Sequence, residues 1–272
     1  MTPTDARAFG SPCAPGGADG LVGFLASLQL NDSAFPSGRY TLSYGLEAFV
    51  QAGIITRSSP PKELLALLGD QIRHGTAPAD AAALACAHRA APTGTVTTGT
   101  ASPGSVTGTV PVELAAGLAA VGAVDARLSA VKLAREARQS SARTGRQLLT
   151  TAAAAFDSPA VTGYCAEVRA GTHPGNAAVA LGLVSAVLGV PLAHAVAGEL
   201  YTFASGWLAA AVRLSVTDHR VAQLVLHRLG PLLESATVTA TTASVDDIRS
   251  CTPLVDVMAM RHERAELRLF SS

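Results

Sequence analysis

The sequence predicts an all-α protein, a single-domain helical bundle of about seven to nine helices with one long flexible internal loop. Three observations support this fold class. Apolar residues recur at helical spacing, and hydrophobic residues make up 49% of the 272 residues, which is ample for a core. Prolines and small polar residues stand where helices would begin. No segment shows the regular alternation, with a partner segment, that predicts a sheet.

The N-terminal region predicts a tail followed by two helices. Residues 1–20 are rich in Gly, Pro and Ala and show no periodicity, so we expect a disordered tail. An apolar first helix over 21–34 should stop at the Phe-Pro-Ser-Gly segment 35–38, because Pro fixes φ and Gly permits a positive φ. A short second helix is expected between a capping Ser43 and Gly53. Its apolar face would consist of Leu46, Phe49 and Val50.

The middle of the chain predicts two shorter helices, a linker and a long helical zone. Residues 59–75 begin with Ser-Pro-Pro and carry leucines at helical spacing, and Pro78 opens an alanine-rich helix that ends near residue 90. Residues 92–111 contain only Pro, Thr, Gly, Val, Ala and Ser, which predicts a flexible insertion in a surface loop. Residues 112–156 then predict a long helical zone.

The remaining helices are expected to complete one domain over residues 21–260. Their starts are marked by a capping residue, a proline or both, at Asp157-Ser158-Pro159, Pro174, Pro191, Thr217-Asp218 and Thr252-Pro253. Residues 261–272 mix charge with apolar side chains and predict a C-terminal tail that becomes ordered on a partner.

The segment Ala177 to Gly198 carries no formal charge apart from His194, and its length would admit a membrane span. Gly189 and Pro191 lie in its middle, and Gly suits the end of one helix while Pro suits the start of another. We therefore expect two buried helices and no membrane contact. The apolar run of residues 21–30 lacks the basic flank of a signal peptide and predicts a first core helix.

Composition and motifs argue against several classes of protein. Twenty basic residues balance twenty acidic ones, so no overall field attracts nucleic acid. The motifs of nucleotide binding, nucleophilic hydrolysis and zinc proteolysis are missing, which predicts that the chain is not an enzyme. The cysteines stand far apart without a histidine at ligand spacing, so we expect reduced thiols, no structural zinc and a cytoplasmic location. They are Cys13, Cys86, Cys165 and Cys251.

A basic helix is expected from Arg127 to Arg146, where six cations accompany only Glu136. A solvated face and a protein-binding patch both explain such a run. Nucleic acid fits it less well, because the segment has no aromatic residue to stack on bases.

Both ends of the chain resemble the urease accessory protein UreF family. Leu28 to Gly53 contains the Ser-x-Phe-Pro-x-Gly turn followed by Ser-x-Gly-Leu-Glu, with Arg39 where members often carry a second Gly. Met260-Arg261-His262-Glu263, followed by a closing Arg-Leu-Phe-Ser, resembles the family's C-terminal tail. Further similarity lies between these ends, in Lys132 to Leu149 with its Gly-Arg-x-Leu-Leu, in His173-Pro174, in Gly182 to Gly189, in Leu200-Tyr201 and in Ala211 to Leu214.

The resemblance implies a scaffold for the maturation of nickel urease that has no cofactor of its own. Such a protein forms a homodimer, binds the accessory protein UreD (UreH in some organisms) and recruits the GTPase UreG for nickel insertion into apo-urease. Nickel would pass through in transit and not be held at a metal site. A chaperone that holds nickel through its own histidines remains the alternative. For the homodimer we expect an interface of Ala- and Gly-rich faces from residues 174–212.

The partner-binding residues are expected within these resembling segments, the basic run and the C-terminal tail. They are Tyr44, Glu47, Arg135, Arg138, Arg146, His173, Tyr201, Arg213, His262, Glu263, Arg268, Leu269 and Phe270.

Overall fold

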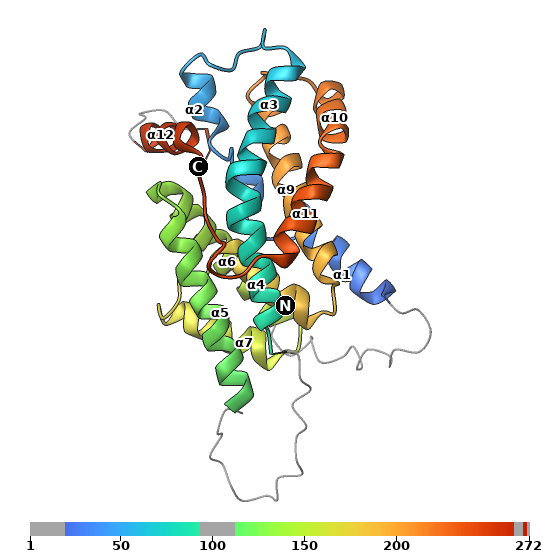
Figure 1. Ribbon diagram of the computed structural model, residues 1–272, viewed down its shortest axis with the longest axis vertical. Helices are drawn as coiled ribbons and strands as arrows, with labels where there is room; N and C mark the ends of the chain where they lie inside the picture. The colour runs from blue at the N-terminus through green and yellow to red at the C-terminus, as the bar shows by residue number, and fades with distance from the viewer. Residues whose placement is uncertain (1–19, 93–111, 264–268, 271–272) are drawn as a thin grey trace, which may run out of the picture.

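The computed structural model describes residues 20–92, 112–263 and 269–270. The expected N-terminal tail up to residue 19, the expected linker from residue 93 on, and Arg268 therefore lie outside the described residues. Within the described part every regular element is a helix, which confirms the all-α prediction. Figure 1 shows these helices along the chain.

The elements in chain order are α1 (Leu21–Asn31), a 3₁₀ turn η2 (Arg39–Thr41), α2 (Leu46–Gln51), α3 (Pro61–Gln71), a π-helical segment η3 (Ile72–Ala81), α4 (Ala82–Ala90), α5 (Val112–Val131), α6 (Arg135–Ala155), α7 (Pro159–Arg169), α8 (Ala177–Val187), α9 (Leu192–Arg213), α10 (His219–Arg228), α11 (Gly230–Thr242) and α12 (Pro253–His262). Because α3, η3 and α4 join without a break, the described residues form eleven separate helices. The expected seven to nine was too low.

One cause of this difference is a break in the expected long helix of residues 112–156. The chain leaves α5 after Val131, and Ala134 has an extended backbone with ψ 131° before α6 begins. Lys132 turns inward, where its Nζ lies 2.8 Å from the Asp80 carboxylate. Arg138 donates to two carbonyl groups of the interrupted stretch at 2.6 Å. The expected basic helix from Arg127 to Arg146 is therefore wrong, since Arg127 lies in α5, Lys132 lies in the break and the other four cations lie in α6.

The opposite happens at Pro78, which does not start a new helix. The rod α3–η3–α4 runs through it and crosses the middle of Figure 1. Proline cannot donate a backbone hydrogen bond and disturbs the preceding turn, which frees carbonyl groups. The segment before α12 satisfies one of them, because Cys251 N donates to His74 O at 2.8 Å. The same segment also contacts the proline, since Arg249 N donates to Pro78 O at 3.0 Å.

Two other boundaries also differ from expectation. The first helix ends at Asn31 instead of Ala34, because the Asp32 side chain accepts a hydrogen bond from the Ala34 amide at 2.8 Å and starts a turn. The helix that begins after Asp218 ends at Arg228, and a second one begins at Gly230.

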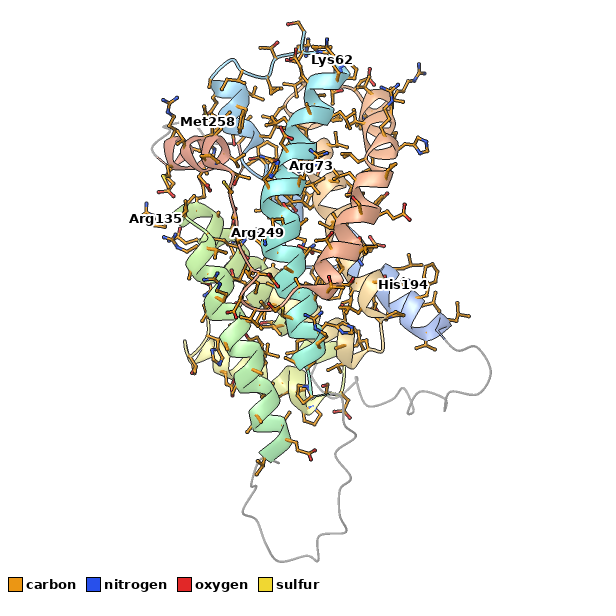
Figure 2. All side chains as sticks on the ribbon, in the orientation of Figure 1. Lys62, Arg73, Arg135, His194, Arg249 and Met258 are labelled. Carbon is orange, nitrogen blue, oxygen red and sulfur yellow. The ribbon has the colours of Figure 1, made fainter. Side chains whose placement is uncertain are left out.

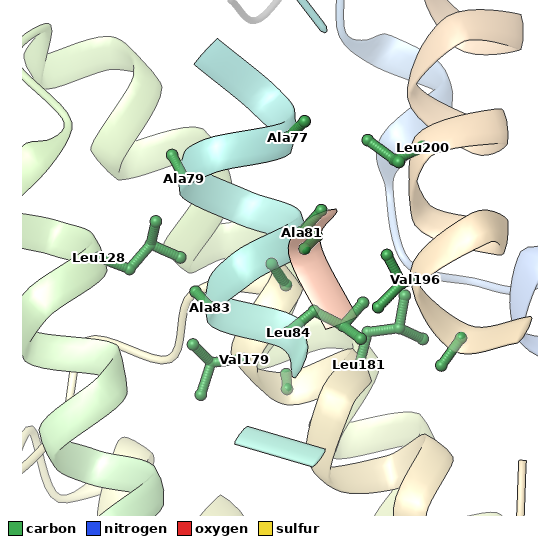
Figure 3. Packing of buried hydrophobic residues seen from close by; sticks show 14 of the residues in the cluster. Ala77, Ala79, Ala81, Ala83, Leu84, Leu128, Val179, Leu181, Val196 and Leu200 are labelled. Carbon is green, nitrogen blue, oxygen red and sulfur yellow. The ribbon is translucent and has the colours of Figure 1, made fainter. Parts of the chain in front are cut away.

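The core is built around α4, whose alanines allow the neighbouring helices to approach closely. Figure 3 shows Ala81, Ala83 and Leu84 surrounded by side chains from α5, α8 and α9. A Cβ on Gly182 of α8 would lie 2.5 Å from the Leu84 carbonyl oxygen, so this contact requires glycine. Ten of the eleven residues of α8 are buried, and Trp207 of α9 is fully enclosed.

The apolar segment from Ala177 onward forms two helices, as the sequence predicted. α8 and α9 meet at Gly189, which has φ 70°, and Pro191 precedes the first turn of α9. Among the described helices, α5 and α9 are long and apolar enough to cross a membrane. Core helices meet the same criteria, and α9 buries 50% of its most apolar stretch inside the protein.

Candidate functional site

A buried polar cluster lies where α2, α6, α12 and the last described residues meet. It consists of Glu47, Glu136 and His262, with relative exposures of 2%, 8% and 3%. Figure 2 labels Met258 on α12 and Arg135 at the start of α6, both on this side of the molecule. Three ionisable side chains so deeply buried require partners, and each finds them within the cluster.

Both ring nitrogens of His262 face a carboxylate. Nδ1 lies 2.8 Å from Glu136 Oε2, and Nε2 lies 3.1 Å from Glu47 Oε2. A histidine between two carboxylates joins three helices through one side chain, because His262 ends α12 while Glu136 begins α6 and Glu47 begins α2. Neighbouring Glu263 strengthens the junction, since its Oε1 accepts from the Glu136 amide at 3.0 Å. Its Oε2 lies 3.6 Å from Arg135 Nε.

Glu47 also anchors the C-terminal residues. Its Oε1 accepts from the Leu269 amide at 2.8 Å, and its Oε2 accepts from the Phe270 amide at 3.0 Å. The side chain of Gln51, one turn later, donates to Oε1 at 3.3 Å. Tyr44 and Gly45, with φ 53° and 84°, turn the chain sharply just before α2. This turn places Glu47 inside the protein instead of on an exposed helix face.

Arg213, at the end of α9, holds the ring of Phe270. Its guanidinium carbon lies 4.6 Å from the Phe270 ring centre and 4.3 Å from that of Tyr40, and Arg213 also donates to the Tyr40 carbonyl. Cation–π contacts of this kind fix the ring orientation. Leu269 differs from its neighbour, because its side chain is 81% exposed.

A cavity of about 200 Å³ adjoins the cluster, and Glu136 and His262 form part of its wall. Its wall includes two partly buried ion pairs, Arg39 with Glu199 at 2.7 Å and Lys132 with Asp80 at 2.8 Å. Burial lowers the pKa of Arg39, but its favourable interactions with Glu199, Tyr44 and Asp80 together outweigh this effect, and the net shift is upward. Burial raises the pKa of Tyr44 to about 12, so its hydroxyl stays protonated at neutral pH. Such a lining suits water and small polar species.

The expected site residues fall into two groups. Glu47, His262, Leu269, Phe270 and Arg213 come together at the cluster, with Glu263 and Arg135 beside it.

The other expected residues lie elsewhere. Tyr44 packs its ring against Phe203 at 4.9 Å along the cavity wall. Arg138 bonds to backbone within the α5–α6 break, and His173 stacks on Tyr164 with 5.6 Å between ring centres. Arg146 is exposed on α6, and Tyr201 is exposed on α9.

Several residues of the site were not expected from the sequence, and three of them make its central contacts. They are Arg39 and Tyr40 of the 3₁₀ turn and Glu136 of α6. In the sequence Glu136 is the single acid among the cations of residues 127–146, and that isolation is the signal that marks it. Among the described residues, no three His, Cys, Asp or Glu side chains are arranged to hold a metal ion.

Comparison with known proteins identifies the family. A family model described as UreF matches residues 59–230. The chain is 30% identical over 273 residues to the urease accessory protein UreF of Bradyrhizobium sp. (strain ORS 278), with 100% of both chains covered. It is 29% identical over 252 residues to that of Trichodesmium erythraeum, covering 91% of this chain and 96% of the relative. It is 32% identical over 240 residues to that of Bradyrhizobium diazoefficiens, covering 88% and 87%. The chain therefore belongs to the UreF family of urease accessory proteins, which are not catalysts.

Proposed function

We propose that this chain is a cytoplasmic scaffold of urease maturation that binds UreD, recruits the GTPase UreG and thereby directs nickel into apo-urease. Membership of the UreF family supports the role in urease maturation. The proposal that the chain binds a partner rests on how Leu269 is held at the surface. Its backbone is fixed to the buried Glu47 carboxylate, while its apolar side chain points outward.

An anchored backbone with a free apolar side chain is suited to binding a partner. The exposed side chain gains by burial in a pocket, and the entropic cost of ordering the segment is partly met within this chain. Phe270 behind it is packed against the core, so the anchor does not depend on the partner. We infer that UreD covers Leu269 and the adjoining outward side of α12, where Leu254 and Val257 are exposed.

The test substitutes the exposed side chain and keeps the anchor. A truncation after Met260 would also remove buried His262, so Leu269→Asp is the sharper variant. We expect it to weaken binding to UreD about tenfold or more, because a fully buried leucine contributes about 1.5 to 3 kcal/mol. The matched control is Val238→Asp, on the exposed side of α11. Unchanged UreD binding by Leu269→Asp, measured by calorimetry, would refute this surface.

We also propose a homodimer, but with an interface centred on α1 and not on the Ala- and Gly-rich faces of residues 174–212. Helix α8 is buried in the core of the protein, so its faces are not available to contact a second copy. Helix α1 instead leaves five large apolar side chains more than two-fifths exposed, and it packs along α9, where Tyr201 is exposed. An apolar patch of this kind is typical of an interface. The five residues are Leu21, Val22, Phe24, Leu25 and Leu28.

The alternative, a chaperone that holds nickel by its histidines, finds less support. Of the seven histidines, His262 and His173 face carboxylates, and His88 bonds to the Val190 carbonyl at 2.8 Å. Equilibrium dialysis of tag-free protein separates the two functions. We expect nickel affinity no tighter than about micromolar, since chelation needs several ligands at one point. A nanomolar site would favour the alternative.

A further inference from the structure

The two contacts of His262 bear on which of its ring nitrogens carry a proton. A neutral imidazole carries one N–H and one lone pair, so only one of its nitrogens can donate. In this structure both nitrogens lie within hydrogen-bond distance of carboxylate oxygens, at 2.8 and 3.1 Å. A lone pair facing a carboxylate oxygen at either position would be repulsive, and the burial of all three side chains strengthens that repulsion.

The other bonds of Glu47 support the same assignment. Its two oxygens already accept from two backbone amides and from the Gln51 side chain, and all of these groups are donors. Glu47 therefore acts as an acceptor toward His262 as well, which requires a proton on Nε2. The 2.8 Å contact with Glu136 places the second proton on Nδ1.

We propose that His262 is a proton-operated latch for the C-terminal segment. Doubly protonated, it ties α12 to α2 and α6 and holds the Glu47 carboxylate where it binds the Leu269 and Phe270 amides. When the pH rises, one ring proton passes to solvent, a carboxylate then faces a lone pair, and the segment is released. The closed form, in which Glu47 holds the two amides, binds one more proton than the open form, in which they are released. Alkaline conditions therefore favour the open form.

The surrounding charges are compatible with this direction. From α2 the group facing His262 is Glu47, and from α6 it is Glu136, with Arg135 held away by Glu263. The cations of the adjoining cavity are each paired with a carboxylate of their own. The remaining groups around the cluster are Arg39 with Glu199, Lys132 with Asp80, Tyr44, Asp256, and Arg213 behind Phe270. The latch rests on these contacts alone and does not depend on which partner binds Leu269.

Nuclear magnetic resonance of the full chain tests the latch. Histidine ring ¹⁵N shifts report the protonation of His262. Hydrogen exchange of the Leu269 and Phe270 amides, corrected for its intrinsic pH dependence, reports whether these amides are bound to Glu47. We expect a doubly protonated ring and protected amides near neutral pH, with both signals lost together as the pH rises. In His262→Gln we expect protection to fall about tenfold and to lose its pH step. His219 is exposed at the start of α10, so His219→Gln is the matched control and should behave as the unsubstituted protein.

A second variant keeps the test decisive if His262→Gln does not fold. Glu136→Gln removes one carboxylate from the ring but leaves Glu47 and the two amides in place, so release should move to lower pH. A singly protonated His262 beside protected Leu269 and Phe270 amides would overturn the proposal. So would a release curve in Glu136→Gln that coincides with that of the unsubstituted protein.

Discussion

Asp125 is fully buried in α5, and its carboxylate organises the turn before α8. It accepts from the Tyr164 hydroxyl at 2.7 Å, from the Gly175 amide at 2.6 Å and from the Asn176 amide at 2.9 Å. Burial, and the charge of Asp125 beside it, raise the pKa of Tyr164, so the phenol remains a donor at every physiological pH. One carboxylate thus replaces the regular hydrogen bonds that this turn lacks.

We predict that Asp125→Asn lowers the free energy of unfolding by about 2 to 3 kcal/mol, because the new amide group presents a donor to donors and leaves buried groups unsatisfied. Urea denaturation measures the change. Asp70→Asn, whose ion pair with Arg73 is exposed, is the matched control and should alter stability little. A loss in Asp125→Asn no larger than that of the control would contradict this role for the carboxylate.

Asp218 provides a prediction with a pH dependence. Its side chain caps α10, and hydrogen bonds from the Val221 and Arg220 amides hold its pKa below the ordinary value. Because its pKa is lower in the folded protein, the ionised Asp218 carboxylate stabilises the fold at any pH above the ordinary pKa of about 3.9. This stabilisation is lost as the pH falls through the lowered pKa of the folded protein.

Asp218→Ala should therefore lower the melting temperature at pH 7, and the difference from the unsubstituted protein should shrink under strongly acidic conditions. Thermal unfolding followed by circular dichroism provides the measurement. Asp246→Ala, in the exposed segment after α11, serves as the control. A difference that stays constant with pH would show that the cap acts without its charge.

Among the elements, the close contact between α4 and α8 depends on a single glycine. Gly182→Ala would place a methyl group 2.5 Å from the Leu84 carbonyl oxygen, so the helices must move apart. We predict a loss of about 1 to 3 kcal/mol in urea denaturation, as in other overpacked cores. Gly69→Ala is the matched control, since its new Cβ would meet Leu232 at an ordinary 3.6 Å. That variant should be neutral or gain up to about 1 kcal/mol from helix propensity. Equal effects of the two substitutions would rule out the packing explanation.

The helices that the sequence predicted well are those with local start signals. Pro61, Ser158, Asp218 and Pro253 all stand within a residue of an observed helix start. The elements it missed depend on distant partners. Residues 131–135 contain no proline or glycine that would predict the break between α5 and α6. The inward turn of Lys132 depends instead on Asp80 from another helix. The π-helical passage through Pro78 likewise depends on amides from residues 249–251.

The candidate site was predictable only in part, because its residues come from distant segments of the chain. Family resemblance pointed to Glu47 and His262 from motifs at opposite ends of the chain. It could not show that the two side chains bond to each other inside the protein, 215 positions apart in sequence. Glu136 completes the cluster from a third segment. The many basic residues around it in the sequence predict a solvated surface instead of a buried site.

At the scale of the whole molecule, the most unusual surface is that of α1. Figure 1 shows this helix at the edge of the bundle, away from α12 and the candidate site. Of its residues only Gly23 and Leu30 are buried, although the helix carries large apolar side chains on most of its surface. A second copy of this chain is the occupant we propose, so the dimer and the C-terminal partner would use opposite regions of the protein.

We predict that Leu25→Glu converts the proposed homodimer to a monomer. In a two-fold interface each substitution occurs twice, so two unpaired charges would have to be buried together. The fold itself should be unaffected, because Leu25 is 55% exposed within one chain. Light scattering at micromolar concentration measures the mass, and circular dichroism checks the helix content. Val238→Glu, 64% exposed on α11, is the control that should remain dimeric. If the unsubstituted protein is a monomer, or if Leu25→Glu remains a dimer, α1 does not form the interface.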